Sequence, residues 1–208
     1  MNQQRPRPQL YLVTPRIADP APLLWTMNGT LEAGDVAALL LRLEPSDERT
    51  LINRAKAVAT AVQRREVALL LDGLPDIAMR AGADGAHLTG VAALAAAIDT
   101  LKPDRIAGAG GLRSRHDAML AGEAGADYVM FGEPDDSGSR PAFDIVLERL
   151  AWWAELFQCP CVGYAENLDE VGPLAQTGAD FVALGDSIWT KAPAAAVAAA
   201  IDRLAPPV

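Results

Sequence analysis

The stretch "AGADGAHLTG", residues 81–90, contains the repeat that decides how the rest of the chain is interpreted. Its Gly-Ala-Asp triplet returns in "EAGADYVMFG" (123–132) and "TGADFVALG" (177–185), and a degenerate copy, "EAGDV", occupies 32–36. Each copy follows a segment with helical spacing and precedes a short apolar run. Glycine ends helices in the left-handed conformation, and aspartate is a poor strand former. Each triplet therefore predicts a turn from a helix into a strand.

Short apolar runs of strand length lie along the chain, and each is followed by a longer segment with helical spacing. We expect strands at 9–13, 36–41, 67–71, 85–88, 105–109, 128–132, 161–164 and 181–184. We expect helices at 22–33, 48–64, 74–81, 91–101, 114–124, 144–157, 168–177 and 193–204. Continuous aliphatic strands are typical of a parallel sheet covered by helices, so the pattern predicts a compact (β/α)₈ TIM barrel. An open doubly wound sheet is the alternative.

Length and composition fit one α/β domain. The chain has 208 residues, of which 50% are hydrophobic, and no linker divides it, so we expect a single domain over 1–208 with a flexible segment at 1–8. The formal net charge of -9 opposes binding to nucleic acid. Because no apolar run has the length of a signal peptide or a membrane helix, we expect a cytoplasmic protein without a membrane partner. Cys159 and Cys161 are expected to be buried thiols.

A barrel directs the search for functional residues to the strand ends opposite the Gly-Ala-Asp turns. Arg42 follows the second expected strand, and Asp72 follows the third. Asp72 could be an oxygen ligand for Mg²⁺ or an N-cap for the next helix. After the eighth strand, Gly185 and Ser187 begin a short segment whose backbone amides could bind phosphate at a helix N-terminus.

The segment 131–144, "FGEPDDSGSRPAFD", is a long polar loop after the sixth expected strand. Hydroxyls and amides of Ser137 and Ser139, together with Arg140, could hold an anion there, and a mobile surface loop is the alternative. His87 lies within the fourth expected strand. It is either a hydrogen-bonded core histidine or a group at the barrel mouth.

Four strings, in this order and spacing, resemble the thiamine phosphate synthase family from Gln9 to Leu204: "QLYLVT", "AGADGAHL", "EAGADYVMFG" and "GADFVALGDSI". The resemblance implies a TIM barrel that joins a hydroxymethylpyrimidine pyrophosphate to a thiazole phosphate and releases pyrophosphate with the help of Mg²⁺. It implies no organic cofactor. The chemistry would be ionisation of an activated C–O bond, with cations stabilising the leaving pyrophosphate.

The family motifs can be compared with this chain position by position. The strand-2 motif Gln-Leu-Arg-Glu-Lys aligns with 40–44, where Arg42 matches the arginine and Glu44 stands in place of the lysine. The Asn-Asp pair after strand 3 becomes Asp72 followed by a glycine, and the metal-binding aspartate after strand 4 falls at Ala92. One carboxylate of the implied metal site therefore remains.

The phosphate-binding motifs are retained in part. The family's Thr-x-Thr-Lys segment aligns with 137–140, Ser-Gly-Ser-Arg. The Val-Ser pair at its strand-8 end falls at Gly185 and Asp186, with Ser187 one place further on. The resemblance implies Arg42 and Asp72 as catalytic residues and Asp72 as the ligand of Mg²⁺. It implies that phosphate is bound by Arg42, Ser137, Ser139, Arg140, Gly185 and Ser187.

Two further functions remain open. The thiazole tautomerase branch of the family needs no metal and would place a histidine at the barrel mouth. A barrel that kept an anion site without the chemistry would be a non-catalytic, ligand-binding or regulatory protein. In each case the expected ligand is a small phosphorylated pyrimidine or thiazole compound, and a homodimer is left open.

Overall fold

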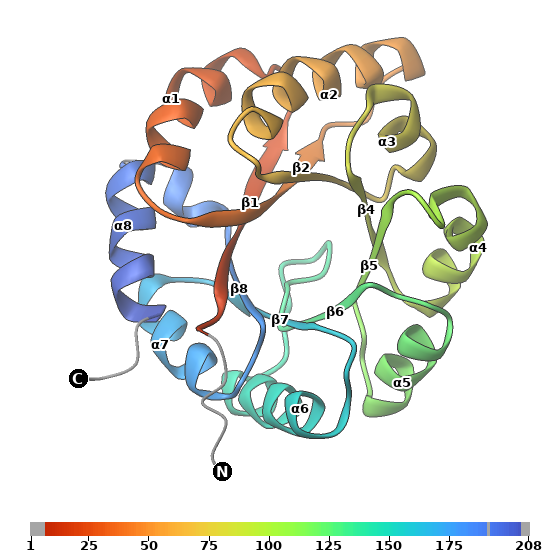
Figure 1. The fold of residues 1–208 in the computed structure, drawn as a ribbon, viewed down its shortest axis with the longest axis vertical. Helices are drawn as coiled ribbons and strands as arrows, with labels where there is room; N and C mark the ends of the chain where they lie inside the picture. Colours follow the sequence, from red (N-terminus) through yellow and green to blue (C-terminus); the bar gives the residue numbers. More distant parts are fainter. Residues whose placement is uncertain (1–6, 191, 205–208) are drawn as a thin grey trace.

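The structure is a computed structural model that describes residues 7–190 and 192–204, with the exception of the side chain at position 186. These residues form a closed barrel of parallel strands in chain order, and a ring of helices surrounds it (Figure 1). The predicted single-domain TIM barrel is confirmed as a fold, and the open sheet is excluded. Most of the segment expected to be flexible, residues 1–6, lies outside the described residues.

The elements alternate regularly along the chain. The strands are β1 (Gln9–Ile17), β2 (Val36–Leu43), β3 (Ala68–Asp72), β4 (Gly85–Thr89), β5 (Ile106–Gly110), β6 (Tyr128–Phe131), β7 (Cys161–Ala165) and β8 (Phe181–Leu184). The helices are α1 (Ala21–Glu32), α2 (Glu48–Gln63), α3 (Pro75–Ala81), α4 (Val91–Leu101), α5 (Arg115–Glu123), α6 (Phe143–Leu156), α7 (Leu168–Gln176) and α8 (Pro193–Leu204). A short 3₁₀ helix, η1 (Asp186–Thr190), follows β8, where the sequence predicts a short helix.

β1 is longer than expected, and the difference matters for the site. The sequence predicts its end at position 13, but the strand continues to Ile17 alongside β2. The register shifts between Val13 and Arg16, and beyond this bulge Arg16 pairs with Arg42. The bulge takes Pro15 out of the hydrogen-bonded ladder, so a residue without an N–H does not end the strand.

The Gly-Ala-Asp triplets form the predicted turns. Gly82, Gly125 and Gly178 have φ angles of 75°, 94° and 88°, in the left-handed region that glycine adopts without a steric penalty. Each triplet follows a helix, α3, α5 or α7, and precedes a strand, β4, β6 or β8. The turns therefore lie at the N-terminal ends of the strands, as expected.

The aspartates of the triplets also join neighbouring strands. One carboxylate oxygen of each accepts the backbone N–H of the first or second residue of the preceding odd-numbered strand, at 2.7–2.8 Å. The backbone N–H of each aspartate donates to the carbonyl of that same residue, at 2.8–3.1 Å. The pairs are Asp84 with Leu69, Asp127 with Ala107, and Asp180 with Cys161. Each triplet thus fixes the register of two strands.

The strands are buried on both faces. In β1, Leu10 and Leu12 face the helices, whereas Tyr11 and Val13 face the inside of the barrel. The interior is filled by side chains from alternate positions, so the barrel is a packed core and not a pore. Polar and charged side chains line a cavity where this filling ends, at the C-terminal ends of the strands.

Two other expectations from the sequence concern the cysteines and membrane-spanning helices. Cys161 is fully buried and Cys159 is partly buried, and burial raises the pKa of these thiols to about 12 and about 11. They are inert core thiols, as expected. Within the described helices, none is long and apolar enough to cross a membrane.

Candidate active site

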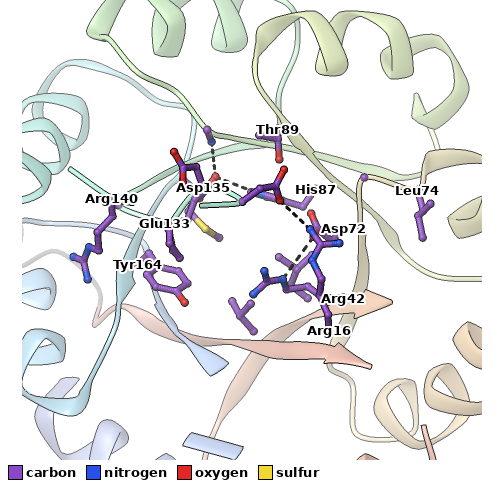
Figure 2. A pocket seen from close by; sticks show the side chains of 18 of the residues that line it. Arg16, Arg42, Asp72, Leu74, His87, Thr89, Glu133, Asp135, Arg140 and Tyr164 are labelled. Atoms are coloured by element: carbon purple, nitrogen blue, oxygen red, sulfur yellow. Dashed lines mark hydrogen bonds and ion pairs between the residues drawn. The ribbon is translucent and has the colours of Figure 1, made fainter. Parts of the chain in front are cut away.

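A cavity of about 870 Å³ opens at the C-terminal ends of the strands (Figure 2). Its apolar floor is the top of the barrel interior, including Leu40 and Met130. Its polar walls come from β1, β2 and β3 on one side and from the segment after β6 on the other. The cavity brings together four of the predicted site residues: Arg42, Asp72, Ser139 and Arg140.

Two arginines share one wall of this cavity. The bulge in β1 brings Arg16 opposite Arg42, and both guanidinium groups approach Asp72 (Figure 2). Arg16 Nη2 and Arg42 Nε each lie 3.7 Å from the Asp72 Oδ2 atom. The buried Thr14 hydroxyl accepts the backbone N–H of Arg42 at 3.0 Å, which holds β2 against the bulge. The backbone thus fixes where the two cations stand.

Asp72 pairs with these two arginines and does not cap the next helix. The N-cap of α3 is Leu74, so the N-cap interpretation of Asp72 is not borne out by the geometry. Its side chain is 17% exposed, and its oxygen faces the two guanidinium groups. Two adjacent positive charges disfavour a cation at the same carboxylate.

Of the carboxylates that the resemblance implies for Mg²⁺, the cavity contains Asp72. Among the described residues, no group of three or more His, Cys, Asp or Glu side chains could hold a metal ion. The family's second carboxylate position, Ala92, lies on α4 and does not line the cavity. Asp72 as a metal ligand therefore stays a prediction from the sequence.

A buried histidine lies at the floor of the cavity. The Nε2 atom of His87 is 3.4 Å from Glu133 Oε1, and its Nδ1 atom is 2.8 Å from the Tyr128 hydroxyl. The Tyr128 hydroxyl is in turn 2.9 Å from the hydroxyl of Tyr11. Both open interpretations of His87 hold in part, because it is hydrogen-bonded in the core and also lines the cavity.

The electrostatics of this network depend on Glu133. Burial lowers the pKa of His87, but the charge and hydrogen bond of Glu133 outweigh burial, so the net pKa is raised above 6.5. Burial is also the main reason that the pKa of Tyr128 lies well above its ordinary value. The pKa of Tyr11 is raised as well, chiefly by burial, so both tyrosine hydroxyls stay neutral beside His87.

Glu133 is held in place by the backbone. The N–H of Gly111 donates to Glu133 Oε1, and a Cβ at Gly110 would overlap the Glu133 carboxylate and the His87 ring. Oε2 of Glu133 is buried and has no hydrogen-bond partner in the part of the chain that the structure describes. The contact between His87 and Glu133 therefore requires glycine at position 110 for steric reasons.

The polar loop after β6 folds around one of its own carboxylates, the side chain of Asp135. Asp135 Oδ1 accepts hydrogen bonds from the backbone N–H groups of Ser137 and Ser139, at 2.9 and 3.0 Å. The Ser137 hydroxyl also donates to it, at 2.5 Å, and these bonds lower the pKa of the exposed Asp135. Asp135 thus occupies two backbone amides and the Ser137 hydroxyl, and Ser137 does not line the cavity, whereas Ser139 does.

Arg140 reaches the cavity from the opposite wall to Arg16 and Arg42 (Figure 2). Its guanidinium group is held by Glu166 and Glu170, with N–O distances of 3.1 and 3.0 Å, and it lies over the ring of Phe143. Its side chain is only 13% exposed. The carboxylates fix its position and offset its charge.

The residues predicted after β8 lie away from the cavity lining. The Ser187 hydroxyl donates to the carbonyl of Glu166 at 2.9 Å, and a Cβ at Gly185 would overlap the Tyr164 hydroxyl. Neither residue lines the cavity. Their role in phosphate binding stays a prediction that the geometry does not support directly.

Sequence reasoning did not identify Arg16 or Glu133 as members of the site. Arg16 follows a proline beyond the expected end of β1, and Glu133 is one of several acids in the loop after β6. In each case the available signal was a charged residue shortly after the expected end of a strand. Their pairing with Arg42 and His87 depends on register and side-chain contacts, which no local pattern specifies.

The comparisons agree with the resemblance seen in the sequence. The family model described as thiamine monophosphate synthase matches residues 10–188. The chain belongs to the thiamine phosphate synthase family. The thiamine-phosphate synthase of Rhodospirillum centenum is 39% identical over 195 residues, which cover 91% of this chain and 94% of that protein. That of Hyphomonas neptunium is 39% identical over 210 residues, which cover 95% and 94%.

Solved structures support the fold of this family member. The thiamine phosphate pyrophosphorylase from Pyrococcus furiosus matches with a TM-score of 0.79 at 21% identity, covering 95% of this chain and 96% of that chain. A 3-hexulose-6-phosphate synthase matches with a TM-score of 0.73 at 18% identity, covering 94% and 99%. Because differently named enzymes share this barrel, activity has to be argued from the site.

Proposed function

We propose that this family member is a thiamine phosphate synthase of thiamine biosynthesis, a transferase that joins a hydroxymethylpyrimidine pyrophosphate to a thiazole phosphate. The observation that carries the proposal is the distribution of cations in the cavity. Arg16 and Arg42 stand on one wall and Arg140 on the opposite one. Two phosphorylated substrates need two such positions, with an apolar floor between them for the rings.

In this reaction the protein has to stabilise a leaving pyrophosphate. Arg42 would donate hydrogen bonds to the pyrophosphate as the C–O bond ionises, and Asp72 would orient its guanidinium group. The thiazole nitrogen then captures the pyrimidine carbocation. No general base is needed, because the nitrogen that attacks carries no proton. We include a cytoplasmic location and the small phosphorylated ligands in this proposal, and the homodimer stays a prediction that sedimentation can test.

Turnover tests the proposal directly. Purified protein is incubated with the two phosphorylated precursors, once with Mg²⁺ and once with EDTA, and product is separated by chromatography. We expect product with the wild type and a loss of roughly 100-fold or more in Arg42→Gln, the size of effect of removing one transition-state donor. Arg49→Gln, an exposed arginine on α2, is the matched control. No product from the wild type at high concentration would contradict the proposal.

One observation favours a second candidate, the proton transfer of the tautomerase branch. His87 and Glu133 meet at the cavity floor with 3.4 Å between Nε2 and Oε1, in reach of a bound ring. Such an enzyme would exchange a ring C–H of a thiazole phosphate with D₂O, and His87→Gln would abolish the exchange. NMR of the ligand in D₂O, without the pyrimidine substrate, distinguishes this candidate from the transferase.

A further inference from the structure

We propose that Arg16, delivered by the bulge in β1, is the second cation of an anion subsite that binds a diphosphate group between Arg16 and Arg42. Nothing in the family motifs assigns a role to this residue. The inference deepens the proposed function, because diphosphate is the leaving group of that reaction. The binding itself can be measured without any turnover.

The backbone geometry places the two arginines side by side. Along the ladder of β1 and β2, Val13 pairs with Leu40 and Arg16 with Arg42, so β1 advances three residues while β2 advances two. Without this extra residue, Arg16 would point to the other face of the strand. Bulges beside active sites commonly re-aim a side chain in this way.

The charges at this wall leave room for an anion. Arg16 contacts Asp72 at 3.7 Å and Asp136 at 3.3 Å, and the side chain of Asp136 is 97% exposed. An ion pair with a carboxylate this exposed is weak. The two contacts to Asp72 are at the long end of ion-pair distances. A diphosphate with several negative charges would therefore compete well for the Arg16 guanidinium group.

The second cation of the subsite does not come from the position where the family motif has a lysine, which is Glu44 in this chain. Glu44 is exposed and does not line the cavity. Its backbone N–H donates to the carbonyl of Ile17 at 2.9 Å, and its own carbonyl accepts from Arg54 at 3.3 Å, while its side chain stays outside the cavity lining. The glutamate thus does not oppose an anion in the cavity, and the cation opposite Arg42 comes from β1.

The ligand class follows from the donors. Each guanidinium presents a fork of N–H groups that matches two oxygens of one phosphate, and two adjacent forks match a diphosphate better than a monophosphate. Two guanidinium groups supply positive charge that can neutralise a diphosphate without a metal ion. The subsite is expected to bind diphosphate with or without a divalent cation.

Calorimetric titration with inorganic diphosphate, in EDTA, tests the inference. We expect the wild type to bind, and Arg16→Gln and Arg42→Gln each to weaken binding roughly 10- to 100-fold, since each removes charged hydrogen bonds. Arg16→Lys should recover part of the loss, and Arg49→Gln should bind like the wild type. Inorganic phosphate should bind more weakly than diphosphate. Melting curves of the unliganded variants check that each is folded.

The outcomes separate this inference from the proposed function. Equal diphosphate binding by the folded Arg16→Gln variant and the wild type would overturn the role of Arg16, even if the wild type makes product. Binding that appears only when Mg²⁺ is added would overturn the metal-free subsite. If the wild type binds diphosphate through Arg16 but makes no product, the subsite stands and the synthase proposal fails.

Discussion

The pKa of the buried His87 is lowered by burial and by Arg42 and raised by Glu133 and Asp72, with Glu133 the strongest of these charged neighbours. Its side chain is 4% exposed, its Nε2 atom faces Glu133, and its Nδ1 atom faces the Tyr128 hydroxyl. Burial alone would keep the imidazole neutral, and the carboxylate reverses this by raising its pKa. The sequence places His87 in a strand but contains no sign of this reversal, because Glu133 is separated from it by 46 residues.

The first prediction follows from the sign of that shift. A raised folded-state pKa means that protonated His87 contributes stability below about pH 6.5, and that this contribution is lost as the pH rises through the folded-state value. In Glu133→Gln, burial remains without the carboxylate, so the pKa of His87 should fall below its ordinary value. NMR titration of the imidazole measures the pKa, and urea unfolding at about pH 6 and pH 9 measures the stability.

The stability difference between wild type and Glu133→Gln should therefore shrink as the pH rises. His116, the other histidine of the chain, provides the second imidazole signal in the same spectra. A pKa of His87 that is the same in both proteins would contradict the coupling between these two residues.

At the scale of the elements, each Gly-Ala-Asp turn joins two strands as well as ending a helix. The aspartates accept backbone N–H groups of the neighbouring strands and donate back to the same residues. The sequence identifies these turns correctly, since the left-handed glycine and the poor strand former act locally. It does not reveal the bond from each aspartate to the neighbouring strand.

The second prediction concerns Asp84, whose carboxylate accepts the Leu69 N–H at 2.7 Å and contacts the Gln63 amide. Asp84→Ala leaves a part-buried strand N–H without its partner, so we expect a loss of about 1–3 kcal/mol in the free energy of unfolding. Asp35→Ala, in the exposed degenerate copy, is the matched control and should stay within about 0.5 kcal/mol. Urea unfolding compares the variants. Equal losses of unfolding free energy in Asp84→Ala and Asp35→Ala would show that the hydrogen bond from Leu69 to Asp84 makes no specific contribution to stability.

The third prediction concerns the loop after β6, which is folded around Asp135. In Asp135→Ala, the backbone amides of Ser137 and Ser139 lose their acceptor, so their hydrogen exchange should become faster. The melting temperature should change little, because the loop is exposed. Asp136→Ala is the control, since its carboxylate contacts Arg16 and not these amides. Unchanged exchange in Asp135→Ala would contradict the assigned hydrogen bonds.

At the scale of the whole molecule, strands that form the cavity walls also close the barrel. The cavity walls come from β1, β2 and β3 and from the segment after β6, and β1 closes the barrel by pairing with β8 as well as with β2. A ligand that binds the wall formed by β1, β2 and β3 thus stabilises the closed barrel, and the unfolded chain has no equivalent site.

The fourth prediction is therefore ligand-linked stability. Inorganic diphosphate at about 100 times its Kd should stabilise the protein by about 2.7 kcal/mol. For a chain of 208 residues this corresponds to roughly 5–10 °C in the melting temperature. The shift should be much smaller for Arg42→Gln at the same ligand concentration. A fluorescence melting curve is sufficient, and an equal shift in both proteins would place the bound ligand elsewhere.

The sequence by itself determined the order of strands and helices, the turns between them, and the positions of Arg42 and Asp72 at strand ends. These features follow from local preferences: apolar periodicity, left-handed glycines and the chain order of a parallel barrel. Only the tertiary structure decided that Arg16 stands opposite Arg42, that Glu133 meets His87, and that the loop after β6 is occupied by its own carboxylate. Those pairings depend on strand register and on contacts between distant residues. A short window of sequence encodes neither the strand register nor these contacts, because a shift of the register by one residue changes every partner of a strand.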